Sequence, residues 1–144
     1  MEIANVGKVH ARARIENMND LYDVSKGTRR PEEVRQIEIP DALVDTGAMF
    51  LSLPRRYIEQ LGLQRYRTRK ALTTGGVVES GMYGVVRLTI QERDCVVEVA
   101  EVADECPVLI GQIPLEALDF VVDPAGGRLI GNPAHGGEHM MELY

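Results

Sequence analysis

The sequence predicts an all-β protein, a closed barrel or sandwich of many short strands with one or two short helices. Two patterns lead to this class: stretches in which apolar and polar residues alternate, and turn-forming residues that recur about every ten positions. The length of 144 residues fits one domain with its own core, and a hydrophobic content of 44% is typical of a folded chain.

The first predicted strand has the clearest pattern, because residues 8–16 alternate strictly. Its apolar positions, which share one face, are Val9, Ala11, Ala13 and Ile15. Residues 17–20 then favour a turn, residues 21–24 a partner strand, and residues 28–33 a polar loop.

A second group of strands surrounds one acidic position. We expect a strand over residues 34–39, a corner at Pro40 and Asp41, and apolar strands at residues 42–44 and 50–53. These strands approach and leave the segment that carries the candidate chemistry.

A short helix is expected to begin at Pro54 and to end at Gly62, with Ile58 and Leu61 on one face. The pair Gly75-Gly76 then suits a mobile hairpin tip between two longer strands. The remaining predicted elements are the hairpin strands at 66–74 and 77–90, a second hairpin of 87–90 and 95–102, a buried strand at 108–110, a short helix at 114–118, and strands at 120–122 and 128–130.

The sequence changes character at Asn132. Residues 132–144 begin polar and glycine-rich, which predicts a mobile tail. We therefore expect one domain over residues 1–131 followed by a C-terminal tail over residues 132–144.

The charge balance indicates which partners to expect. With 16 Lys and Arg against 22 Asp and Glu, the formal net charge is −6, which argues against a nucleic-acid binder. One segment reverses this balance, with Glu59 as its single acidic residue and the basic residues Arg55, Arg56, Arg65, Arg67, Arg69 and Lys70. A solvated basic face is the favoured interpretation, and a site for acidic substrate residues is the alternative.

The protein is expected in the cytoplasm, away from membranes. The first eight residues have neither a basic start nor an apolar core typical of a secretory signal, and no stretch approaches the ~20 apolar residues of a membrane span. Cys95 and Cys106 lack the paired spacing of a zinc site and are expected to be reduced.

The candidate chemistry lies in the segment 42–48, where three apolar residues lead Asp45 into a tight Thr46-Gly47 turn. A buried carboxylate without partners is costly, so its presence in an apolar strand calls for an explanation. Gly47 permits a close backbone approach, and the small Thr46 and Ala48 leave room for a second copy of the loop.

The motif Asp45-Thr46-Gly47-Ala48, followed some sixty residues later by Leu109-Ile110-Gly111, resembles the single-domain retropepsin-like aspartic proteases of the bacterial type. The resemblance implies a closed, barrel-like acid-protease fold with a flap hairpin. Pepsin-type enzymes carry the Asp-Thr/Ser-Gly loop twice, whereas here it occurs once, so the family's active site implies a homodimer.

The resemblance implies an aspartic endopeptidase that acts on extended peptide or protein substrates without a metal or cofactor. Two carboxyls sharing one proton can act as base and acid, and Asp45 of each chain would supply them. The catalytic assignments are Asp45, Thr46 and Gly47, and Thr46 would form a hydrogen bond across the two-fold axis. The substrate-binding assignments are Ala48 and the flap residues Gly75, Gly76 and Val77. Leu109, Ile110 and Gly111 are assigned a structural role beneath the loop.

Two positions depart from the viral members of that family. An acidic residue and an arginine form an ion pair there, and Met49 and Gln112 replace them here. The dimer is therefore expected to rely on other contacts, including strands at residues 1–6 and from Arg128 into the tail.

Three alternatives accompany this assignment. Asp45 could simply cap backbone amides in a turn, or the chain could be a non-catalytic dimeric module that binds peptides or serves as a scaffold. The tail also contains the zinc-protease pattern H-x-x-E-H from His135 to His139, but Gly136 and Gly137 oppose the helix that such a site requires.

Overall fold

The computed structural model describes residues 8–123 and 125–143. The strand expected at residues 1–6 lies outside these ranges. Within them, no helix combines the length and apolar character needed to cross a bilayer.

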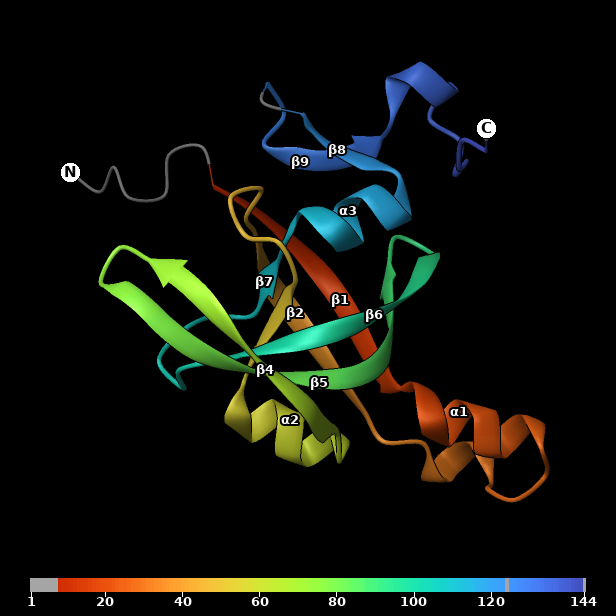
Figure 1. Ribbon diagram of the computed structural model, residues 1–144. Coiled ribbons are helices and arrows are strands. Elements are labelled where there is room, and N and C mark those ends of the chain that lie inside the picture. The colour runs from red at the N-terminus through yellow and green to blue at the C-terminus, as the bar shows by residue number, and fades with distance from the viewer. Residues whose placement is uncertain (1–7, 124, 144) are drawn as a thin grey trace.

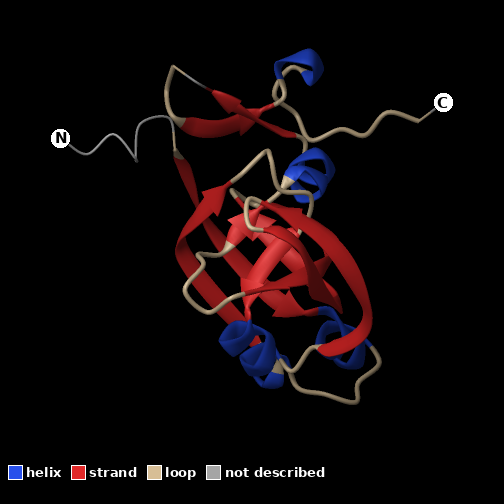
Figure 2. Cartoon of the chain, turned by 60° about the vertical axis from the view of Figure 1, so that its left-hand side comes forward, coloured by secondary structure: helices blue, strands red, loops and turns tan. Residues whose placement is uncertain are grey.

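The prediction of an all-β fold is confirmed. One seven-stranded sheet has the strand order β1-β2-β7-β3-β6-β5-β4, and an additional pairing of β1 with β5 closes it into a ring (Figures 1 and 2). Its strands are β1 (Val9–Asn17), β2 (Gln36–Val44), β3 (Leu51–Pro54), β4 (Gln64–Thr73), β5 (Gly76–Ile90), β6 (Arg93–Val102) and β7 (Leu109–Ile110). A two-stranded sheet of β8 (Phe120–Asp123) and β9 (Arg128–Gly131) follows, and the helices are α1 (Met18–Ser25), α2 (Arg55–Leu61) and α3 (Gln112–Leu118).

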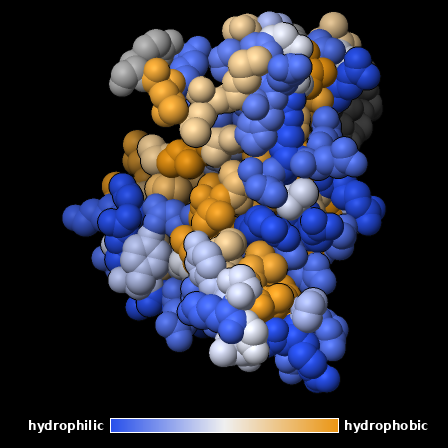
Figure 3. All heavy atoms as spheres, turned by 90° about the vertical axis from the view of Figure 1, so that its right-hand side faces the viewer, coloured by the Kyte–Doolittle hydropathy of each residue, from blue (hydrophilic) through white to orange (hydrophobic). Residues whose placement is uncertain are grey.

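The interior of the ring forms the hydrophobic core. The largest fully buried side chains include Ile15, Leu51, Leu53, Leu88 and Ile110, which come from β1, β3, β5 and β7. Burial of each such side chain contributes about 1.5–3 kcal/mol to folding. On the face shown in Figure 3, hydrophilic atoms predominate and hydrophobic ones appear in patches between them.

The expected turn at residues 17–20 and strand at residues 21–24 are wrong, because helix α1 occupies this segment. Asn17 caps the helix, its side chain accepting a hydrogen bond from the Asp20 amide at 3.1 Å. The sequence signal for a turn, Asn followed by Asp, is also the signal for a helix N-terminus.

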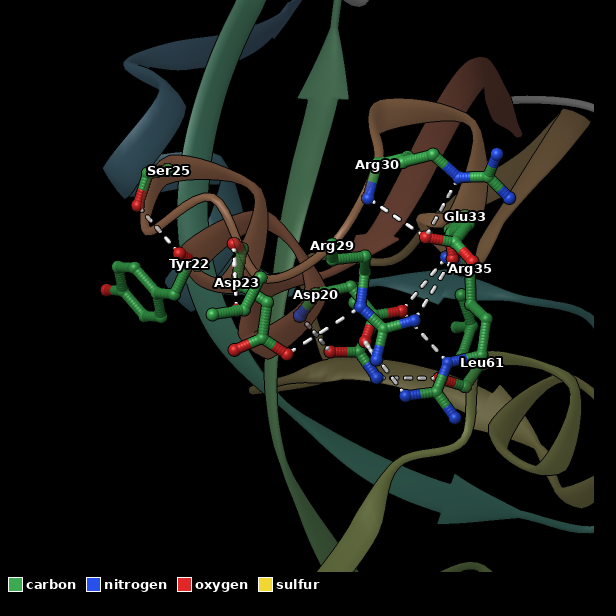
Figure 4. A network of polar contacts seen from close by, with 11 residues as sticks. Asp20, Tyr22, Asp23, Ser25, Arg29, Arg30, Glu33, Arg35 and Leu61 are labelled. Atoms are coloured by element: carbon green, nitrogen blue, oxygen red, sulfur yellow. Dashed lines mark hydrogen bonds and ion pairs between the residues drawn. The ribbon is translucent and has the colours of Figure 1, made fainter.

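An ion pair between buried Asp20 and exposed Arg35 joins α1 to the segment that leads into β2. Asp20 is 1% exposed, and its two carboxylate oxygens accept hydrogen bonds of 2.9 Å each from the Arg35 guanidinium (Figure 4). These hydrogen bonds hold the pKa of the Asp20 carboxyl below its ordinary value. A contact between residues so far apart could not be read from the local pattern.

The corner expected at Pro40 and Asp41 is also wrong. Strand β2 continues through both residues to Val44, and the pairing with β1 shifts between Ala11, opposite Ala42, and Ala13, opposite Ile39. Between these two pairs, β1 has one residue, Arg12, and β2 has two, Pro40 and Asp41. This mismatch is a β-bulge, and a bulge is one of the few places in a sheet that tolerate proline.

Most of the other predicted elements are present within one or two residues. Helix α2 ends at Gly62, whose φ of 66° is the left-handed conformation expected at a helix end. The β4–β5 hairpin turns at Thr74 and Gly75, where the Thr73 hydroxyl donates to the Gly76 carbonyl at 2.9 Å.

The tail expected to be mobile is anchored to the end of α3. The imidazole of His135 lies between two carboxylates, with Nδ1 2.6 Å from Asp119 Oδ2 and Nε2 3.1 Å from Glu142 Oε1. Asp119 also accepts hydrogen bonds from the Met140 amide and the Asn132 side chain. Because ionised carboxylates only accept hydrogen bonds, this geometry favours an imidazolium that donates from both nitrogens.

We expect the attachment of the tail to be strongest between about pH 4 and pH 6.5. The bond to Asp119, followed by that to Glu142, raises the pKa of His135 above 6.5, so its stabilisation is complete below 6.5 and is lost as the pH rises through the raised value. The bond from His135 lowers the pKa of Asp119 from 3.8 to about 2, so its stabilisation is present above 3.8 and is lost as the pH falls through about 2.

Hydrogen exchange at the Met140 amide, corrected for intrinsic rates, measures this attachment across the pH range. The His135→Gln variant should lack the loss of protection on the alkaline side. Protection that stays constant in the wild type from about pH 5 to pH 9 would contradict the assignment.

Candidate active site

The segment that contains Asp45 connects two strands that do not pair with each other. Strand β7 lies between β2 and β3, with Leu43 opposite Leu109 on one side and Leu51 opposite Ile110 on the other. The Asp45 amide donates to the Ile110 carbonyl at 3.0 Å. The loop 45–50 therefore passes over the end of β7.

The start of α3 fastens the same loop through main-chain hydrogen bonds. The Gln112 amide donates to the Ala48 carbonyl at 2.8 Å, the Ile113 amide to the Met49 carbonyl at 2.9 Å, and the Gly111 amide to the Phe50 carbonyl at 3.1 Å. The predicted structural segment 109–111 thus lies directly against the loop.

Gly111 is needed for this contact because the backbones approach too closely for a side chain. A Cβ atom at Gly111 would lie 2.5 Å from the Phe50 carbonyl oxygen and 2.7 Å from the Ala48 carbonyl oxygen. Both neighbours are main-chain atoms, so neither can move aside as a side chain could.

Asp45 itself is half-buried rather than buried, and Thr46 and Gly47 are exposed. Its Oδ1 accepts a hydrogen bond of 2.9 Å from the Gly47 amide, and its carbonyl accepts one of 3.0 Å from Ala48. The backbone-capping geometry of a turn aspartate is therefore present. That geometry uses one carboxylate oxygen, and no described residue donates a hydrogen bond to Oδ2.

A groove of about 660 Å³ runs from this loop to the β4–β5 hairpin. Ala48, which was assigned to substrate binding, lines it together with Phe50 and Met82. Gly75, Gly76 and Val77 lie at the exposed hairpin tip, and the groove wall is formed further along the strands, by residues 69–73 and 78–80.

A smaller apolar hollow of about 340 Å³ lies on the other side of the loop, lined by residues 46–49 with Gln112 and Ile113. Met49 is 58% exposed and Ile113 is 41% exposed. The Gln112 amide group donates to Glu116 at 3.0 Å, within its own helix. The loop thus presents apolar rather than charged groups beside Asp45.

The two tail histidines do not converge on a common point. His135 is held by Asp119 and Glu142, whereas His139 Nε2 lies 3.0 Å from the Ala117 carbonyl oxygen. The segment Pro133–His135 is a single 3₁₀ turn rather than the helix that the H-x-x-E-H pattern requires. Among the described residues no group of three His, Cys, Asp or Glu side chains is placed to hold a metal ion.

Phe50 and Met82 line the groove but were not assigned a role from the sequence, and Arg69 was named only as part of the basic run, with a site for acidic substrate residues as the alternative. Whether Arg69 and Met82 point into the groove depends on which face of β4 and β5 covers the loop. Alternation along β4 could have grouped Arg69 with Ala71, but the partner face could not be chosen without the sheet register.

Comparison with known proteins gives one positive result. A family model described as aspartyl protease matches residues 33–126, which is more than half of the chain and includes the loop, the hairpin and β7. A search of curated proteins finds no match.

Replacing Gly111 with alanine should lower the free energy of unfolding by about 1–3 kcal/mol, because the new methyl group meets main-chain oxygen atoms. The matched control is Gly75→Ala, where the nearest atom to a Cβ is Thr73 Oγ1 at 3.7 Å. Urea unfolding at one protein concentration measures both variants. Equal stability of the two would show that the contact between Gly111 and the loop is not tight.

Proposed function

Because the chain belongs to the aspartyl protease family, we propose that it is an aspartic endopeptidase whose Asp45 acts together with Asp45 of a second copy. The observation that carries the proposal is the position of Asp45 on a loop held by main-chain hydrogen bonds, whose residues Gly47 and Ala48 line both the groove of about 660 Å³ and the exposed apolar hollow. The protease domain would comprise residues 1–131, with residues 132–144 as its tail.

The reaction requires a water molecule that attacks the peptide carbonyl and a leaving amine that receives a proton. One Asp45 carboxylate would take a proton from the water, and the protonated Asp45 of the other copy would polarise the carbonyl and then protonate the amine. The unused oxygen of Asp45 supports this role, since Gly47 engages only Oδ1. Thr46 would donate a hydrogen bond to the partner loop, and Gly47 would allow the substrate backbone to approach.

An extended peptide would lie in the groove as an additional strand. Ala48 would contact it from below, and Gly75, Gly76 and Val77 would close over it from above as a flap that excludes water. The Thr73 hydroxyl is bonded to the backbone at the tip, which supports a flap that moves as one unit.

The homodimer proposed here would be of the bacterial single-domain kind, with apolar contacts where the viral enzymes have an ion pair. Met49 and Ile113 are exposed next to the loop that must meet its copy. Burial of such side chains between two chains would replace the missing charges.

Asp45→Asn should reduce peptide cleavage by about 10²- to 10⁴-fold and leave the chain folded, since it removes only a titrating group. Asp41→Asn, on the exposed part of β2, is the matched control and should keep wild-type activity. The assay is cleavage of a peptide library with and without pepstatin. Pepstatin-insensitive turnover that survives in Asp45→Asn would refute the aspartic mechanism, and peptide binding without turnover in the wild type would favour the non-catalytic module.

A shared site also predicts that activity depends on association. At a fixed total protein concentration, activity should fall as the square of the wild-type fraction when Asp45→Asn chains are mixed in, because mixed dimers have one active carboxyl. Ile113→Asp should shift the protein to monomers in sedimentation and remove activity. Val96→Asp, at a position that is 50% exposed on β6, is the control and should remain dimeric. Constant specific activity in samples that sediment as monomers would rule out the shared site.

A further inference from the structure

We propose that Arg69 makes the groove selective for substrates with an acidic side chain at one position. The inference rests on the proposed peptidase function and concerns its specificity. Its starting point is the placement of each basic residue of the segment 55–70.

The other arginines of this segment that form ion pairs do so outside the groove wall. Arg55 Nε lies 2.9 Å from Glu101 Oε2, Arg56 Nη1 3.6 Å from Asp104 Oδ1, and Arg67 Nη2 3.6 Å from Glu98 Oε2. Among the described residues, Arg69 forms no ion pair with a carboxylate. Three of the six basic residues are thus held by surface pairs on a solvated face. Of the other three, Arg69 and Lys70 line the groove.

The sheet register places Arg69 on the side of the hairpin that covers the groove. Arg69 lies opposite Ser80 and Ala71 lies opposite Val78, and residues two apart or directly opposite share one face. The guanidinium of Arg69 lies 5.4 Å from the centre of the Phe50 ring, immediately beyond the Asp45 loop. Arg69 is therefore the charged residue on the hairpin face that it shares with Ala71, Val78 and Ser80.

Three other charged residues line the groove. Lys70 and Glu79 lie opposite each other in the register, on the other face of the hairpin from Arg69. Glu101 accepts hydrogen bonds from Arg55 at 2.9 Å and from the Tyr83 hydroxyl at 2.8 Å. A peptide that lies along the face carrying Arg69 would thus meet a cation that no described carboxylate neutralises.

The ring of Phe50 orients this cation without neutralising it. A guanidinium over an aromatic face keeps its N–H groups available at the edge, where a carboxylate can accept two of them. Exclusion of water by a bound peptide would strengthen that pairing. The matching ligand is an aspartate or glutamate side chain of the substrate.

The test starts from a peptide sequence that the wild type cleaves. Each position of that peptide is replaced in turn by Glu or by Gln, and the two versions are compared. At one position, the Glu peptide should have a kcat/KM about fivefold higher than the Gln peptide, which corresponds to the free energy of one partly solvated ion pair. Added salt should reduce this ratio, because it screens the charges. Arg69→Gln should abolish the ratio and Arg69→Glu should reverse it. Arg67→Gln, on the same strand but paired with Glu98, should leave it unchanged.

Equal cleavage of Glu and Gln peptides at every position would overturn the proposal, as would a preference that survives in Arg69→Gln. An equal decrease in kcat/KM for the Glu and Gln peptides in Arg69→Gln would also refute it, because Arg69 would then act only by stacking on Phe50. If no Asp45-dependent cleavage is found, the peptidase proposal fails, and anisotropy of labelled Glu and Gln peptide pools on the Asp45→Asn protein still tests Arg69. Tighter binding of a Glu pool that Arg69→Gln removes supports the proposal, and equal binding refutes it.

Discussion

The close approach of main chain to main chain at Gly111 is the constraint on which the rest of the site depends. Strand β7 holds one end of the loop 45–50 through the Ile110 carbonyl, and the first amides of α3 hold its other end. These are backbone hydrogen bonds, so the loop keeps its shape whatever side chains it carries outward. The side chains of Met49 and Gln112 take no part in these bonds, since the loop is held there by the Met49 carbonyl and the Gln112 amide.

The fold could be predicted where the signals are local. Alternation identified β1, and paired glycines identified the tip of the β4–β5 hairpin. Prediction failed where distant residues decide the structure. Helix α1 was missed because its Asn17 cap carries the same local signal as a turn, and its Asp20 pairs with a residue outside that pattern, Arg35. The continuous passage of β2 through Pro40 coincides with a bulge against β1. The tail was expected to be mobile because its attachment to Asp119 joins segments that the sequence separates.

The candidate site, too, could be predicted from the sequence only where its residues are contiguous. Asp45 and its supporting segment 109–111 were recognisable as motifs, since each is a continuous run of residues. The wall of the groove was not, because it is assembled from two strands and depends on their register. The predicted contacts at the hairpin tip concern residues that lie beyond the groove of one chain, so their role depends on closure over a substrate. The wall residues nearer the loop, Arg69 among them, emerged only from the three-dimensional arrangement.

The open edge of β4 has a further consequence. Among the strands that the structure describes, β4 is the last in the sheet order and pairs with β5 alone, so its outer main-chain groups are available to a strand from another molecule. A hairpin of this kind is prone to aggregation. Its edge strand, however, carries Arg65, Arg67, Arg69 and Lys70, and two such edges brought together would repel each other. The basic run therefore also protects the protein's solubility, which requires no contact with any ligand.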